Sequence, residues 1–276
     1  MLFDSHAHLN SEGYTPDELA EVVRAIESSS LSYVVDVGFD LKSSRAALKH
    51  AENWPWCYAA IGCHPHDVKA MDDIQLAMLK NLARRPKAVA IGEIGLDYYR
   101  DLSPREDQQY WFRRQIQLAN ELRLPIVIHS RDADQDVLTI LKEEDAFSPE
   151  RCAWFPERPI PEGYSHGRDA RVLLHCYSGS RELAEQYVRL GATISFAGPL
   201  TYHNNRRGVE TAKALPLDYI LIETDAPYLT PEPLRGRPNI SPYVEHVARK
   251  LAEIKEVDYE VAAAATLANA RRFFNI

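Results

Sequence analysis

Two histidines near the start of the chain, His6 and His8, are the first residues whose type and spacing could do chemistry. They follow a short apolar run, and positions two apart on a β-strand point to the same face. Both imidazoles would then converge on one point. Two neutral nitrogen donors suit a divalent ion of the zinc, manganese or iron type better than calcium. A pair of ordinary hydrogen-bonded histidines is the alternative, and the rest of the chain decides between the two.

Five further side chains that can bind metal stand directly after short apolar runs. They are His64, Glu93, His129, His175 and Asp225. The chain has ten histidines in all, so five of them at such positions form a pattern that chance explains poorly. A hydrogen-bonded core histidine is the alternative for any single member, but the set favours one common site.

The number of these groups indicates two metal ions rather than one. The six candidate ligands are His6, His8, Glu93, His129, His175 and Asp225. They exceed what one ion with an open position needs, whereas two ions about 3.5 to 4 Å apart fit the count. Glu93 is the candidate bridge, because a carboxylate has two oxygens and its strand lies between the two histidine pairs. The local charge of about +2 would attract phosphate, with Asp225 as general base.

Short apolar runs and amphipathic segments alternate along the chain, and they must position these residues. The apolar runs predict eight strands, namely the segment that leads to His6 and residues 33–37, 57–61, 88–91, 125–128, 172–174, 192–196 and 219–222. The amphipathic segments and their capping residues predict helices at 15–26, 42–51, 73–84, 103–122, 132–144, 182–190 and 207–214.

This alternation predicts a closed (β/α)8 TIM barrel, since continuously apolar strands belong to a parallel sheet and eight such units need about 250 residues. A doubly wound open sheet is the alternative. In a TIM barrel the active site lies at the carboxyl ends of the strands, where the candidate ligands stand. Two more helices, 241–254 and 258–274, are expected to cover the outer wall of the barrel.

The whole chain, residues 1–276, is expected to form a single domain with an insertion at about 145–170. This segment holds four prolines and two glycines and is too long for an ordinary connection. Because it precedes a strand, it should lie at the end of the barrel opposite the catalytic rim. A plain surface insertion is the favoured interpretation, and a mobile lid is the alternative.

The composition is that of an ordinary globular protein, with 45% hydrophobic and 26% charged residues. The start of the chain lacks the pattern of a signal peptide, no stretch is apolar enough to span a membrane, and a cytoplasmic location is therefore expected. Four cysteines without a Cys-x-x-Cys pair indicate reduced thiols. The net charge of −8 excludes a broad basic surface for nucleic acid, so an anionic substrate must be held locally.

Six motifs resemble those of the TatD family of metal-dependent hydrolases. They are FDSHAHL (3–9), GCHPH (62–66), GEIGLDY (92–98), IHSRDA (128–133), HCYSG (175–179) and ETDAPYL (223–229). The resemblance implies an amidohydrolase-like TIM barrel with deoxyribonuclease activity. It implies that His6, His8 and Asp225 bind a first ion and that His129 and His175 bind a second. Glu93 then bridges the two ions, and His64 lies beside them and contacts the scissile phosphate.

Several residues near these motifs are candidates for substrate contact. Arg131 could hold a phosphate, or it could pair with Asp132 or Asp97. Arg235 and Arg237 are favoured as anion contacts because they follow the last strand. Tyr228 and Tyr98 are further candidates, because each could stack on a base, although each could also simply pack. Cys63 and Cys176 stand beside candidate ligands, but strand alternation should turn them away from the metals.

The leading hypothesis is a two-metal phosphodiester hydrolase that uses Mg2+, Mn2+ or Zn2+ and digests single-stranded DNA from the 3′ end. The direction of digestion is implied by the family resemblance alone. An amidohydrolase or lactonase acting on a small molecule is the alternative, although many such enzymes bridge their metals with a modified lysine where this chain has Glu93. A non-catalytic binding module would not need Asp225 as a base. No membrane partner and no obligate protein partner are expected.

Overall fold

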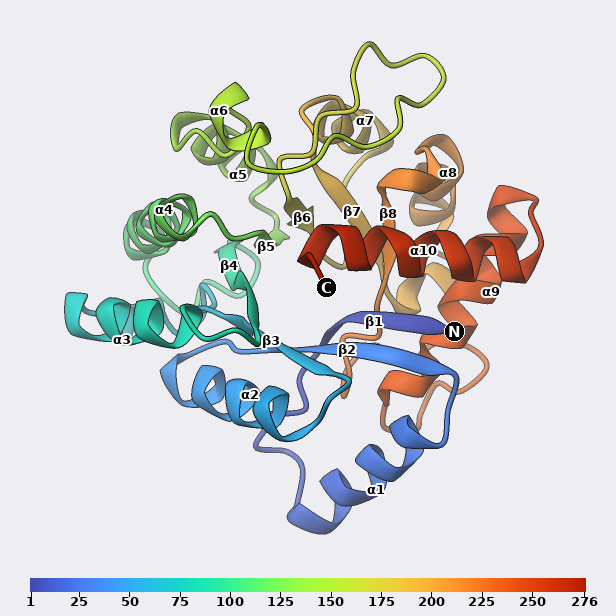
Figure 1. The fold of residues 1–276 in the computed structure, drawn as a ribbon, viewed down its shortest axis with the longest axis horizontal. Helices are drawn as coiled ribbons and strands as arrows, with labels where there is room; N and C mark the ends of the chain where they lie inside the picture. Colours follow the sequence, from blue (N-terminus) through green and yellow to red (C-terminus); the bar gives the residue numbers. More distant parts are fainter.

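Eight parallel strands form one sheet, and their order in the sheet is their order in the chain. The structure is a computed structural model that describes residues 1–276. The strands are β1 (Leu2–Ala7), β2 (Leu31–Val37), β3 (Cys57–Ile61), β4 (Ala88–Asp97), β5 (Ile126–Arg131), β6 (Val172–Leu174), β7 (Thr193–Phe196) and β8 (Ile220–Ile222). A bridge between Ala7 and Ala226 brings the segment after β8 back to β1, so the sheet curls into a nearly closed barrel (Figure 1). The predicted TIM barrel is confirmed.

Helices connect successive strands and cover the outside of the barrel. They are α1 (Pro16–Glu27), α2 (Leu41–Asn53), α3 (Asp73–Ala83), α4 (Arg105–Leu122), α5 (Asp134–Glu143), α6 (Pro149–Cys152), α7 (Arg181–Arg189) and α8 (Arg206–Ala214), with short 3-10 helices at Val68–Ala70, Gly198–Thr201, Leu217–Tyr219 and Ser241–Tyr243. The predicted capping box of α1 forms, because Thr15 and Glu18 each accept the other's backbone N–H. No helix combines the length and the apolar character that crossing a membrane requires.

Strand β4 is longer than the predicted 88–91, and all ten of its residues are buried. Two glycines and a glutamate interrupt the apolar run after Ile91, which hides the second half of the strand from a hydrophobicity argument. The glycine at 95 is required by close packing, because a Cβ at this position would lie 2.0 Å from the carbonyl oxygen of His129 on β5. The extension carries both Glu93 and Asp97 within the strand, which has a register irregularity against β5 between Ile91 and Ile94.

The last two helices, α9 (Val244–Lys255) and α10 (Tyr259–Phe274), have different positions. Helix α9 packs on the barrel wall beside β1 and β8, as predicted. Helix α10 instead crosses the amino-terminal end of the barrel, which we call the floor (Figure 1). There Phe273 and Phe274 belong to one hydrophobic cluster with residues of seven strands, and the ring of Phe274 stacks on that of Phe3. The expectation that both helices cover the outer wall is therefore wrong for α10, whose apolar face closes the floor.

The segment 145–170 also lies at the floor, on the side of the barrel predicted for it. The buried guanidinium of Arg151 donates to the carbonyl oxygens of Leu124 and Ala170, just before β5 and β6, at 2.8 and 2.9 Å. Arg158 is buried as well and donates to Asp169 at 2.6 Å and to the hydroxyl of Thr193 at 2.9 Å. Two buried arginines thus anchor this largely exposed segment beneath the strands, and its interpretation as a surface insertion stays a prediction.

Candidate active site

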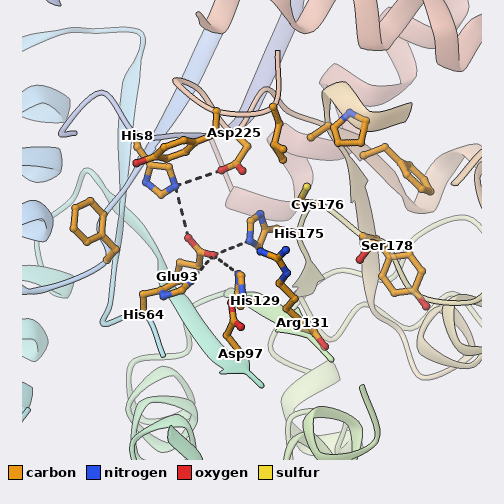
Figure 2. A pocket seen from close by; sticks show the side chains of 18 of the residues that line it. His8, His64, Glu93, Asp97, His129, Arg131, His175, Cys176, Ser178 and Asp225 are labelled. Carbon is orange, nitrogen blue, oxygen red and sulfur yellow. Dashed lines mark hydrogen bonds and ion pairs between the residues drawn. The ribbon is translucent and has the colours of Figure 1, made fainter. Parts of the chain in front are cut away.

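All the candidate ligands meet at the carboxyl ends of the strands, around a cavity of ≈ 730 Å³. Side chains of His8, His64, Glu93, His129, His175 and Asp225 line this cavity. His6 lies directly beneath it and is completely buried. Figure 2 shows the labelled side chains pointing toward one another from different strands, with Glu93 between His8 on one side and His129 and His175 on the other.

Glu93 occupies the centre of the cluster because each of its two oxygens has its own set of neighbours. Oε2 is 3.4 Å from Nε2 of His6 and 3.7 Å from Nε2 of His8. Oε1 is 2.8 Å from Nε2 of His175 and 2.9 Å from Nδ1 of His129. Burial by itself would raise the pKa of Glu93, but the surrounding histidines, His175 foremost, hold that pKa well below its usual range.

The first group, on the Oε2 side, has the spacing of a metal-ligand set. Nε2 of His6 and Nε2 of His8 face each other at 3.3 Å. Oδ1 of Asp225 lies 3.8 and 3.4 Å from these two nitrogens. Neighbouring ligand atoms in a tetrahedral shell with bonds of about 2.1 Å are separated by about 3.4 Å, so the donors fit a divalent ion.

The second group, on the Oε1 side, contains three histidines rather than the two expected. His64 joins His129 and His175, with its Nε2 at 3.4 Å from Oε1 of Glu93. Nitrogen and carboxylate donors again converge, which fits a second ion of the same type. Burial lowers the pKa of His64 to about 4, and this histidine is therefore neutral near pH 7.

A further layer of acceptors fixes the orientation of the imidazole rings. The second ring nitrogen of His8 contacts the carbonyl oxygen of Val37 at 2.8 Å, that of His129 contacts Asp97 at 3.0 Å, and that of His175 contacts Glu223 at 3.2 Å. Such partners raise the basicity of a metal-binding histidine and hold its tautomer. Glu223 also accepts from the backbone N–H of Cys176 and from the hydroxyl of Ser195.

Two of these acceptors, Asp97 and Glu223, were not predicted as site residues. The signal that could have found them is their position at strand ends beside predicted ligands. Glu223 directly follows β8 and stands two positions before Asp225, and Asp97 is the last residue of the strand that carries Glu93. His66 belongs to the same layer, because its Nε2 lies 2.9 Å from Asp97.

Comparison with known proteins agrees with this geometry. Residues 3–275 match the family model described as TatD related DNase. The chain belongs to this family. It is 43% identical over its full length to the uncharacterized metal-dependent hydrolase YabD of Bacillus subtilis, of which it covers 100%. It is also 32% identical to the 3'-5' ssDNA/RNA exonuclease TatD of Escherichia fergusonii, and this alignment covers 100% of this chain and 99% of the relative.

A solved structure of a TatD homologue, YJJV from Escherichia coli, has the same fold. It superposes with a TM-score of 0.85 at 29% identity, over 100% of this chain and 98% of the other. The predicted TatD family membership is confirmed, and with it the prediction of a metal-dependent hydrolase. The alignment runs through the whole barrel, so the cluster around Glu93 lies within a shared architecture.

The predicted substrate contacts of this TatD family member divide into two groups. Tyr228 lines the cavity, and 57% of its surface is exposed. His64 and Arg131 line the cavity as well. Arg131 forms no ion pair with Asp132 or Asp97, and its guanidinium instead stacks on the ring of Tyr99 at 4.0 Å.

Arg235 and Arg237 do not line the cavity, which departs from the expectation. The guanidinium of Arg235 stacks on Tyr202 at 4.4 Å and lies 3.8 Å from Glu232, so local partners hold it on the loop surface. Arg237 is exposed on the same loop. Tyr98 is also a packing residue, because its hydroxyl donates to Asp136 and its ring lies under Arg105.

The two cysteines beside candidate ligands have different environments. Cys63 is buried away from the cavity, as expected. Cys176 lines the cavity, which contradicts the expectation that alternation turns it away. Strand β6 ends at Leu174, and Cys176 has a left-handed backbone with φ of 44°, so the alternation of the strand no longer applies. Burial raises the pKa of the Cys176 thiol well above its usual range.

Proposed function

We propose that this protein is a phosphodiester hydrolase that uses two divalent metal ions and acts on the 3′ ends of single-stranded DNA. The observation that carries the proposal is the shared carboxylate of Glu93, which offers one oxygen to His6 and His8 and the other to His129 and His175. Two adjacent cation sites at the mouth of a barrel are the arrangement that phosphodiester hydrolysis uses.

The proposed assignment of ligands to the two ions follows the family resemblance, and the distances to Glu93 and Asp225 are compatible with it. His6, His8 and Asp225 would hold the first ion, His129 and His175 the second, and Glu93 both. Mg2+, Mn2+ and Zn2+ are compatible with nitrogen and carboxylate donors. When bound, the ions would supply positive charge to the phosphate oxygens and acidify a water molecule.

Asp225 is suited to accept the proton of the attacking water. Its carboxylate lines the cavity, and Oδ1 lies 3.4 Å from Nε2 of His8. Burial alone would raise its pKa, but the hydrogen bond from His8 and the charge of the histidines lower it, so Asp225 is ionised near neutral pH. Neutral His64, across Glu93, can donate a hydrogen bond to a phosphate oxygen.

The choice of substrate rests on the shape of the cavity and on relatives. The ligand cluster lies at the bottom of a barrel mouth, where a single strand can reach it and an intact duplex is too wide. Several relatives carry the name 3'-5' ssDNA/RNA exonuclease. The proposed direction of digestion, from the 3′ end, is taken from the names of these relatives.

The test uses purified protein after metal analysis, with Mg2+, Mn2+ or Zn2+ added. Fluorescent single-stranded DNA and RNA oligonucleotides are offered with free ends, with a blocked 3′ end, with a blocked 5′ end and as closed circles. We expect stepwise shortening of linear DNA that a 3′ block prevents. Cuts within the circle, or shortening despite the 3′ block, would refute the proposal. Hydrolysis of amide or lactone substrates without any action on DNA would establish the small-molecule alternative.

A further inference from the structure

The cavity has two chemically different sides, and we propose that they orient the bound strand. Arg100 and Arg131 would hold phosphates of the retained strand, while an apolar wall on the opposite side takes the terminal nucleoside that is released. This inference rests on the proposed function, and it names the residues that decide which way a chain end lies across the metal site.

The cationic side is formed by the loop after β4 and by the end of β5. Arg100 and Arg131 are the two arginines that line the cavity, and both side chains are exposed. No carboxylate lies within ion-pair distance of either guanidinium, whereas Arg105 pairs with Asp101 and Arg249 pairs with Glu245. Asp67 is the single carboxylate of the lining outside the cluster around Glu93 and Asp97. Two unpaired guanidiniums thus remain available to phosphate.

The opposite side is built from the ends of β7 and β8. Strands β4 and β8 face each other across the barrel, because eight strands follow in chain order around it. The wall comprises Phe196, Ala197, Pro199, Leu200, Tyr228 and Leu229. Its two loops pack tightly, since a Cβ on Gly198 would lie 1.8 Å from the carbonyl oxygen of Leu229.

Two of the polar side chains beside this wall, Asn205 and Tyr177, already have partners, whereas the hydroxyls of Ser178 and Tyr228 have none. The amide of Asn205 donates to the carbonyl of Pro199 and accepts from the N–H of Gly208. The hydroxyl of Tyr177 donates to the carbonyl of Ser180. The wall therefore offers contact and stacking to a base, with little hydrogen bonding to its edge, and we expect tolerance of any of the four bases.

The assignment of sides follows from the chemistry of a chain end. On one side of the scissile phosphate the strand continues and carries one phosphate per nucleotide. On the other side lies a terminal nucleoside that bears no further phosphate. The side with the two unpaired guanidiniums therefore suits the phosphates of the continuing strand. The apolar side suits the terminal nucleoside.

The experiment compares substrates that differ in flanking phosphates. Wild type, Arg100→Gln and Arg131→Gln are assayed on a dinucleotide, whose one phosphate is the scissile one, and on a hexanucleotide. Each substitution should raise KM for the hexanucleotide roughly tenfold more than KM for the dinucleotide. Arg249→Gln, an exposed and ion-paired arginine on α9, is the matched control and should change neither value.

Binding without turnover provides a second readout. Fluorescence anisotropy of a labelled hexanucleotide in Ca2+ should give a salt dependence whose slope decreases by about 0.7 for each arginine removed. On the apolar side, a hexanucleotide with an abasic terminal residue should bind more weakly than the intact one, and Leu229→Ala should reduce that difference. Equal effects on dinucleotide and hexanucleotide, together with an unchanged salt slope, would overturn the inference. Arginine-dependent binding with no cleavage by the wild type would instead uphold it and refute the proposed nuclease.

Discussion

Glu93 is the residue on which the two candidate metal sites depend, because each of its oxygens faces a different set of histidines. Substitution Glu93→Ala should reduce the affinity for both ions together, since a bridging ligand serves both. His8→Ala should weaken chiefly one ion, because His8 contacts only the Oε2 side. Metal content after dialysis, measured by mass spectrometry, checks both expectations.

The matched control for these variants is His203→Ala, which removes an exposed histidine on the loop before α8. It should retain the metal content of the wild type. Two ions per chain in Glu93→Ala would show that this carboxylate is not a bridge.

Asp225 provides a different test, because it is proposed both to bind an ion and to accept a proton. Asp225→Asn preserves the shape of the side chain and removes the proton acceptor. We expect kcat to fall by about 10²- to 10⁴-fold while KM for an oligonucleotide changes little. Steady-state kinetics at saturating metal separate the two constants. A large rise in KM with kcat retained would limit Asp225 to a binding role.

At the level of single residues, the sequence was informative where regular strand geometry holds. The alternation rule explains why His6 and His8 converge, and the strand-end rule explains His64, His129 and His175. Both rules lose force in loops. Cys176 faces the cavity because of a left-handed backbone, and Arg235 turns to Tyr202 because of a loop conformation that no periodicity encodes.

Helix α10 contributes to stability through the closed floor rather than through the barrel wall. Phe273 is almost completely buried among inward-facing strand residues. Phe273→Ala should therefore lower the free energy of unfolding by about 3 to 5 kcal/mol, as for other buried phenylalanines. Urea denaturation followed by circular dichroism measures this change. Val261→Ala on the exposed face of the same helix should stay within about 0.5 kcal/mol of the wild type, and a similar loss in both variants would contradict the packing argument.

The anchored segment 145–170 can be tested through Arg158, whose partner Asp169 is also buried. Arg158→Met removes the donor and leaves a buried carboxylate with a weaker contact to Arg272 at 3.5 Å. We expect a loss of about 3 to 5 kcal/mol in unfolding free energy, because breaking a buried ion pair leaves an uncompensated charge. Arg168→Met, an exposed change in the same segment, serves as the control. Equal urea midpoints for the two variants would disprove the anchoring role.

At the level of elements, the apolar runs located all eight strands because each strand is buried on both faces. The extension of β4 was missed because glycines and Glu93 break the apolar run. The position of α10 was missed for another reason. Helical periodicity identifies an apolar face, but it does not say whether that face packs on the wall or under the floor.

The whole molecule separates stability from chemistry along the barrel axis. Helix α10, Arg151 and Arg158 close the floor, while the candidate ligands and the cavity occupy the other end. The net charge of −8 is compatible with the proposed anionic substrate, because two bound ions together with Arg100 and Arg131 would confine the attraction to the cavity.

The closed floor also determines how a product leaves. Because α10 fills the barrel beneath the strands, the cavity is a blind pit and not a tunnel. Under the proposed function, a released nucleotide would leave through the same opening that admits the next strand end. Free nucleotide and strand end therefore compete for one opening, and a deoxynucleoside 5′-monophosphate should raise KM without lowering kcat. The rate of product release then sets an upper limit on the rate of digestion. A faster chemical step at the metal ions would not raise this limit.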